Sequence, residues 1–230
     1  MDSRDEEGIA SIRSILSNTD VIHIYGAGLN SERPAHSAVG ELSERGWAIA
    51  PLHPKDGGAT IEGFPIRPEL DDGIVPKVVV LFLAPERARA VVRNLIIRFE
   101  REQFPLVWFQ LGAEDEQAHQ ALLEMDVPFV EHDCLVRFAQ RHSLQCTTSS
   151  LPQQWFLQTA SEDGDGCSIW SVHSSNSASL NRPLEALEWV GSLNDLKQSN
   201  HTIPRYIRSL KQPDETLQTL AVRLSGEKLT

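Results

Sequence analysis

Cysteine is scarce in this sequence, with 3 among 230 residues and no Cys-x-x-Cys pair. An odd number of cysteines without paired spacing provides no disulfide framework and suits a reducing compartment, so we expect a cytoplasmic protein. The start, Met-Asp-Ser-Arg-Asp-Glu-Glu, is acidic and precedes no long apolar run, so neither a signal peptide nor a transit peptide is expected. The sequence also lacks an apolar run long enough for a membrane span.

Positive charge is also in deficit. The 21 Lys and Arg residues against 32 Asp and Glu residues give 21 − 32, a formal net charge of −11. That sign disfavours nucleic acid or any other polyanion held along an extended surface. A small phosphorylated ligand stays compatible with it, because a helix N-terminus and one or two local cations bind a phosphate whatever the net charge.

Short apolar strands alternate with amphipathic helices over the first 140 residues. The predicted strands are 21–25, 47–52, 77–84, 105–110 and 127–131, and the predicted helices are 5–17, one opening at Pro34, 85–102, 114–125 and 134–142. The segment 77–84 (KVVVLFLA) is apolar enough to be a central strand buried on both faces. This alternation predicts an α/β fold with a Rossmann-like, doubly wound parallel sheet.

The pattern changes beyond residue 142. We expect a Rossmann-like domain over 1–142 to be followed by a polar, Ser/Thr-rich linker over 143–152 and an α+β extension or small second domain over 153–230. In the extension the predicted strands are 155–159 and 167–173, and the predicted helices lie near 183–198, 203–211 and 213–224. The role of this extension is not evident from its residues.

A glycine loop, Gly26-Ala27-Gly28, stands between the first predicted strand and the next helix. Dinucleotide folds bind phosphate at this place, because glycines let the backbone approach the ligand and helix N–H groups point at the anion. The alternative is that the glycines serve only a tight turn with positive φ.

The end of the second strand narrows the choice of nucleotide. NAD requires an acidic residue there to bind the adenosine ribose hydroxyls, and the sequence has Leu52-His53-Pro54-Lys55. A missing carboxylate and a nearby cation favour a ribose that carries an extra phosphate, as in coenzyme A or NADP. The alternative for Lys55 is a solvated loop lysine.

Six motifs in order resemble those of the small bacterial CoA-binding proteins, whose domain is similar to the nucleotide-binding domain of succinyl-CoA synthetase. They are Gly-Ala-Gly, Asn30 to Pro34 (NSERP), His-Pro-Lys, Val79 to Glu86 (VVLFLAPE), Trp108 to Gly112 (WFQLG) and Asp133-Cys134. The resemblance covers roughly residues 15–140. It implies a Rossmann-like domain that binds coenzyme A. Two departures stand out: Gly28 replaces a usual Ser, and the arginine expected soon after Phe82 is absent.

The candidate site follows from this resemblance and from the loop positions. The resemblance implies ligand contacts at the glycine loop, beside it, and after the second and fourth strands. The candidate cofactor-binding residues are Gly26, Ala27, Gly28, Asn30, Arg33, Pro54, Lys55, Phe82, Gln110, Gly112 and Cys134. Cys134 is included because it follows the last strand, where its thiol would lie near the thiol arm of a bound cofactor. The alternative for Cys134 is a small buried residue.

Neither a metal site nor a catalytic set is predicted. Glu131-His132-Asp133-Cys134 contains four metal-ligand types, but adjacent residues on a strand point to opposite faces and cannot all reach one ion. No serine stands in a Gly-x-Ser-x-Gly elbow, and no nucleophile is tied to a particular histidine.

Three hypotheses follow. The leading one is a cytoplasmic protein that binds coenzyme A or an acyl-CoA as a non-catalytic ligand-binding or regulatory module. The first alternative is an enzyme that uses NADP or another nucleotide. The second is an interaction protein with a vestigial pocket. By analogy with folds of this class, a homodimer is the expected assembly.

Overall fold

The computed structural model describes residues 3–57, 59–62, 64–70, 74–147, 154–160, 168–174, 187–198, 200, 202–217, 219–220 and 223. The chain forms two compact units, and both are discontinuous in sequence. Unit 1 comprises residues 1–27, 31–50 and 75–150, and unit 2 comprises residues 28–30, 51–74 and 151–230.

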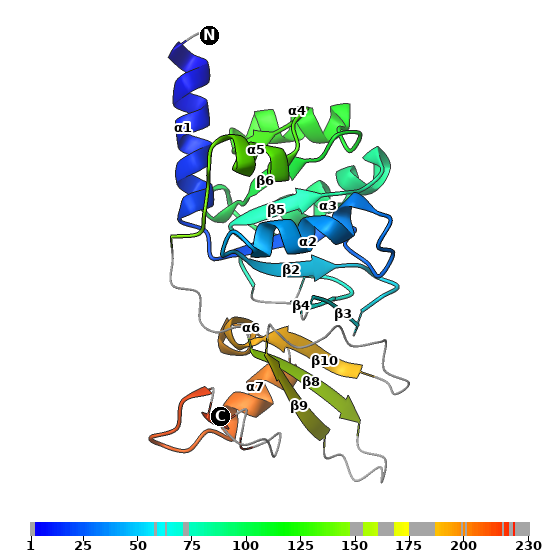
Figure 1. The fold of residues 1–230 in the computed structure, drawn as a ribbon, viewed down its shortest axis with the longest axis vertical. Helices are drawn as coiled ribbons and strands as arrows, with labels where there is room; N and C mark the ends of the chain where they lie inside the picture. The colour runs from blue at the N-terminus through cyan, green and yellow to red at the C-terminus, as the bar shows by residue number, and fades with distance from the viewer. Residues whose placement is uncertain are drawn as a thin grey trace. The chain divides into compact units, whose positions relative to one another are not determined.

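A five-stranded sheet with the order β2-β1-β5-β6-β7 forms the centre of unit 1 (Figure 1). Its strands are β1 (Val21–Tyr25), β2 (Ala48–Leu52), β5 (Val78–Leu81), β6 (Leu106–Phe109) and β7 (Phe129–Val130). The pairings β1–β5, β5–β6 and β6–β7 are all parallel. The chain adds β2 on one side of β1 and then adds β5, β6 and β7 on the other side. The predicted Rossmann-like, doubly wound α/β fold is therefore confirmed.

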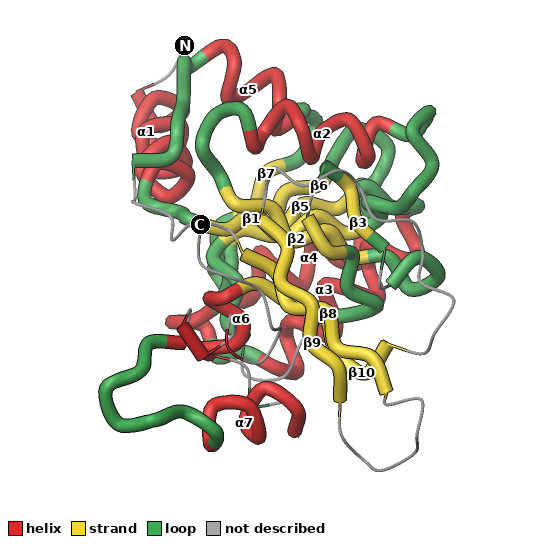
Figure 2. The backbone as a smooth tube through the Cα atoms, turned by 60° about the horizontal axis from the view of Figure 1, so that its bottom comes forward, coloured by secondary structure: helices red, strands yellow, loops and turns green. Residues whose placement is uncertain are grey.

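Helices cover both faces of this sheet. Figure 2 shows α2 and α5 over one face and α3 and α4 over the other, while α1 lies to one side of the strands. Their bounds are α1 (Ser3–Ser17), α2 (Pro34–Ser43), α3 (Pro85–Arg98), α4 (Glu116–Met125) and α5 (Leu135–Arg141), with a short 3-10 turn at Arg101–Gln103. In the part of the chain that the structure describes, no helix combines the length and apolarity needed to cross a membrane.

The core of unit 1 consists of apolar strand residues. All four residues of β5 are fully buried, as the run of valines predicted, because helices pack on both faces of this strand. Trp108 is fully buried in β6 and donates its indole N–H to the carbonyl of Asp133 at 2.9 Å. Its ring meets the ring of Phe138 in α5 edge to face, with centroids 5.1 Å apart.

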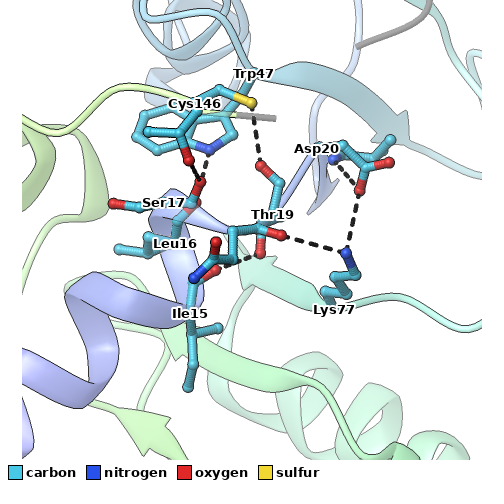
Figure 3. Close-up of polar contacts among 11 residues, drawn as sticks. Ile15, Leu16, Ser17, Thr19, Asp20, Trp47, Lys77 and Cys146 are labelled. Carbon is cyan, nitrogen blue, oxygen red and sulfur yellow. Dashed lines mark hydrogen bonds and ion pairs between the residues drawn. The ribbon is translucent and has the colours of Figure 1, made fainter. Parts of the chain in front are cut away.

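Polar contacts close the amino-terminal edge of the sheet, where α1 ends (Figure 3). The buried Trp47 donates its indole N–H to the carbonyl of Leu16 at 3.0 Å. The Cys146 thiol lies 3.3 Å from the carbonyl of Thr19, and Thr147 donates its hydroxyl to the carbonyl of Ser17 at 2.6 Å. The first residues of the predicted linker therefore pack against unit 1, while residues 148–153 lie outside the described part of the chain.

Unit 2 combines a hairpin from the middle of the chain with elements from its last third. The hairpin is β3 (Thr60–Ile61) and β4 (Phe64–Pro65), which are antiparallel. A three-stranded antiparallel sheet has the order β10-β8-β9, with β8 (Gln154–Ala160), β9 (Ser168–Ser174) and β10 (Leu187–Ser192), and α6 (Leu193–Gln198) and α7 (Thr202–Ser209) follow it.

Two predictions for the last third of the chain were wrong in part. The helix expected near 183–198 begins only at Leu193, because residues 187–192 pair with β8 as strand β10. The helix expected over 213–224 does not begin at 213, since residues 213–216 form a turn and an irregular stretch. In the first case sheet pairing overrides the local helical pattern.

The start of α4 provides a test of this fold. Asp115 is the N-cap, and its Oδ1 accepts the backbone N–H groups of Gln117 and Ala118, each at 3.1 Å. Replacing Asp115 by Ala removes this acceptor, and we expect a loss of about 1 kcal/mol in the free energy of unfolding. Urea unfolding measures the loss. Asp115→Ser, which restores an N-cap oxygen, is expected to recover most of it, and equal stability of Ala and Ser variants would contradict the capping role.

Candidate functional site

The carboxyl ends of β1, β5 and β6 lie side by side in register. Tyr25 pairs with Leu81, and Leu81 pairs with Phe109. The ladder continues for one residue, because Phe82 N–H donates to the Tyr25 carbonyl at 3.0 Å and Gln110 N–H donates to the Leu81 carbonyl at 3.2 Å. Three candidate residues, Gly26, Phe82 and Gln110, therefore lie together at one edge of the sheet.

Gly26 is required by the backbone itself. Its φ is +91°, and a Cβ at this position would lie 2.3 Å from the carbonyl oxygen of Phe82. Only glycine allows the chain to leave β1 so close to the end of β5. Ala27, the next residue, is fully buried. The path of the backbone alone thus requires glycine at the first position of the loop.

Gln110 is the most unusual polar residue at this edge. The residue is only 5% exposed, and its Nε2 has no acceptor among the described residues. Its backbone is satisfied, since its N–H bonds Leu81 and its carbonyl accepts Ala113 N–H at 2.8 Å. A buried amide donor without an acceptor costs free energy, which makes Gln110 a candidate donor to a ligand oxygen.

The turn after β6 is fixed by a carboxylate. Gly112 has a φ of +87°, and its N–H donates to Glu114 Oε2 at 2.7 Å. The other oxygen, Oε1, accepts His132 N–H at 3.2 Å, which ties this turn to the segment after β7. Burial alone would raise the pKa of Glu114, but the backbone N–H groups outweigh it and lower that pKa.

Cys134 and its neighbours bind different partners. Cys134 is half-buried, immediately precedes α5, and donates its backbone N–H to Asp133 Oδ1 at 2.8 Å. Asp133 also pairs with Arg141 at 2.5 Å, while Glu131 contacts His119 Nδ1 at 2.6 Å. Among the described residues, no group of three or more His, Cys, Asp or Glu side chains is arranged to hold a metal ion.

The candidate residues Gly28, Asn30, Pro54 and Lys55 belong to unit 2. Gly28 is buried against a turn that follows β2, where Pro54 and Lys55 are exposed and His53 and Asp56 are half-buried. Asp56 Oδ2 accepts the N–H of Leu29 at 3.0 Å and lies 3.0 Å from His53 Nδ1. The sequence shows no acid at the strand end itself, because Asp56 stands four residues beyond Leu52 and reaches the Leu29 amide through the turn.

Arg67 is a second residue that the sequence argument missed. It is 3% exposed and pairs with Leu52 as a parallel bridge. Its N–H donates to the Pro51 carbonyl and its carbonyl accepts the His53 N–H, both at 2.9 Å. These bonds extend the β2 ladder and fix the backbone from which the turn at His53 departs.

The two remaining candidates, Asn30 and Arg33, are exposed. Arg33 occupies the N-cap position of α2, directly before Pro34 at the first helical position, and its side chain does not cap the helix. Its guanidinium is therefore not used by the helix start.

Comparison with known proteins decides the family. The model of a CoA-binding domain family matches residues 20–139, which is more than half of the chain. The chain belongs to this CoA-binding domain family. The matched region contains every candidate residue named above, from Gly26 to Cys134.

Two solved structures share the fold of this domain. A Thermus thermophilus protein designated cell-free ID.343 is 25% identical, with a TM-score of 0.50, over 58% of this chain and 97% of that chain. Prb, a protein redesigned for binding, is 28% identical, with a TM-score of 0.51, over 58% of this chain and 90% of that chain. Both matches leave about two fifths of this chain without a counterpart.

The glycines of the loop provide a second test. Gly26→Ala places a Cβ against the Phe82 backbone at positive φ, and we expect it to lower the free energy of unfolding by about 2–3 kcal/mol. Gly28→Ala meets the end of the Asp56 side chain, which can move, so a loss of about 1 kcal/mol is expected.

Gly112→Ala is the matched control, because its φ is also positive but no atom lies within 4 Å of the added Cβ. Urea unfolding of the three variants separates backbone strain from the clash. Equal losses for Gly26→Ala and Gly112→Ala would contradict the close approach to Phe82.

Proposed function

We propose that this chain binds coenzyme A or an acyl-CoA at the carboxyl edge of β1, β5 and β6, as a non-catalytic ligand-binding or regulatory protein. Membership of the CoA-binding domain family supports the class of ligand. The observation that supports the place is the buried Gln110 Nε2, which lacks an acceptor among the described residues.

The proposed roles follow from chemistry and position. Gln110 donates its amide N–H to an acceptor oxygen of the ligand. The exposed cation Lys55 binds the ribose phosphate, and Arg33, exposed at the start of α2, adds a second cation for the phosphates. Half-buried Cys134 lies near the thiol end of the ligand. On this proposal coenzyme A is held by backbone, amide and two cations, without a metal.

Gln110→Leu tests the role of the buried amide. Leucine has a similar volume and removes the unbonded donor, so we expect unchanged or higher stability of the free protein and about tenfold weaker binding of coenzyme A. Isothermal titration calorimetry measures the binding, and urea unfolding measures the stability. Gln140→Leu, an exposed change on α5, is the control.

The same titration tests the proposed function as a whole. Absence of heat with millimolar coenzyme A or acyl-CoA, on folded protein stripped of ligand, would contradict it. Tighter binding of NADP than of coenzyme A would favour the enzymatic alternative. A Gln110→Leu variant that unfolds more easily and binds equally well would assign Gln110 to packing alone.

Lys55→Ala tests recognition of the ribose phosphate. The native protein is expected to bind coenzyme A more tightly than 3′-dephospho-CoA, by about two- to fivefold, as befits an exposed ion pair. In Lys55→Ala this preference is expected to disappear, while Lys211→Ala, an exposed lysine of unit 2, retains it. Competition titrations with the two ligands measure the ratio, and an unchanged ratio in Lys55→Ala would remove this lysine from the site.

A further inference from the structure

The backbone amide that follows the glycine loop is bonded by a carboxylate of this same chain. Asp56 Oδ2 accepts the N–H of Leu29, the residue after Gly28, at 3.0 Å across 27 positions of sequence. The turn that positions Asp56 is held by backbone bonds, from Asp56 N–H to the His53 carbonyl at 3.3 Å and from Ala59 N–H to the Asp56 carbonyl at 3.1 Å.

Gly28 makes this contact sterically feasible. A Cβ at Gly28 would lie 2.3 Å from Asp56 Oδ2 and 3.0 Å from two carbons of the His53 ring. The space that a side chain would occupy is therefore filled by the carboxylate and the imidazole. His53 Nδ1 also lies 3.0 Å from Asp56 Oδ2, and both side chains are mostly covered, with exposures of 29% and 24%. Gly28, His53 and Asp56 thus form one packed set.

The electrostatic consequence concerns any phosphate that approaches this part of the loop. Backbone N–H groups in such loops are the donors that hold phosphate oxygens. A carboxylate has the same sign of charge as a phosphate and uses the same donor. The two anions cannot share the Leu29 amide, and two like charges at hydrogen-bonding distance from one donor repel each other.

We propose that Asp56 is a specificity-determining residue of this site, whose carboxylate competes with the diphosphate of coenzyme A for the Leu29 amide. The proposal rests on the proposed function, since it concerns the ligand named there. Coenzyme A binds after the carboxylate leaves the amide, so Asp56 lowers affinity for phosphorylated ligands. His53 favours the occupied state, because its ring packs on Gly28 and its Nδ1 lies beside the carboxylate.

Asp56→Asn is the decisive variant, because it removes the charge and keeps the shape. Calorimetric titration with coenzyme A is expected to show about tenfold tighter binding than in the native chain. The affinity rises because the group that competes for the Leu29 amide is then neutral, and a neutral acceptor bonds the amide more weakly than a carboxylate does. Asp56→Ala is the second variant, and it is expected to bind coenzyme A at least as tightly as the native chain. Asp214→Asn, an exposed acid of the same unit, changes the net charge equally and is expected to leave the affinity unchanged.

Each outcome decides between the two proposals. Tighter binding in Asp56→Asn than in a native chain that itself binds coenzyme A supports the competition. Equal binding in native chain and Asp56→Asn overturns it and leaves coenzyme A binding intact. Weaker binding in both Asp56 variants, with native-like urea unfolding, overturns it in favour of a carboxylate that contacts the ligand directly. Absence of binding in every variant overturns both the function and the competition.

A structural readout accompanies the titration. In the ¹H–¹⁵N spectrum of the free protein, the Leu29 amide resonance is expected to shift strongly in Asp56→Ala and to stay in place in Asp214→Asn. A Leu29 resonance that is the same in native chain and Asp56→Ala would show that the carboxylate does not bond this amide in solution, which also overturns the competition.

Discussion

Backbone hydrogen bonding at the carboxyl ends of β1, β5 and β6 determines where the candidate site lies. Because Tyr25, Leu81 and Phe109 share one register, the three loops that follow begin at the same level of the sheet. The register also forces β1 to turn against the Phe82 carbonyl, and Gly26 is the residue that permits this. A shift of one residue in any of these strands would turn every side chain at the edge to the opposite face. The strand pairing therefore positions Gln110 without any contribution from a ligand.

Much of unit 1 could be predicted from the sequence, because its strands are short and uniformly apolar. The run Val78 to Leu81 is buried on both faces and has no polar residue that suits a surface. Strand ends were harder to predict: the apolar residues Phe82 and Leu83 extend the run, but strand β5 ends at Leu81. In unit 2, residues 187–192 form a strand although they follow a helical pattern, because the partner that decides it, β8, lies some 30 residues earlier. Local patterns carry no information on such distant pairings.

The candidate site was predicted less completely than the fold. The place of Gly26, Phe82 and Gln110 at one edge of the sheet could be predicted, because each follows a recognisable strand and parallel strands bring such residues together. Asp56 was missed because its approach to Leu29 depends on a turn and on the empty side-chain space of Gly28. Neither is visible as a motif, although the departure from the usual serine at Gly28 pointed to the right position. Arg67 was missed for a related reason, since its backbone pairing with Leu52 crosses the β3–β4 hairpin.

The division of the chain has a consequence for how the molecule is made. Residues 28–30 and 51–74 belong to unit 2 together with residues 151–230, so they leave the ribosome long before most of that unit exists. Chains grow at about 5–20 residues per second, and amino-terminal parts fold first. The elements of unit 1 after Val75 are thus synthesised while the Leu29 and Asp56 segments still await most of their own unit. The glycine loop is thus divided between the two units: Gly26 and Ala27 belong to the unit whose strands are synthesised first, and residues 28–30 belong to the unit whose last residues are synthesised last.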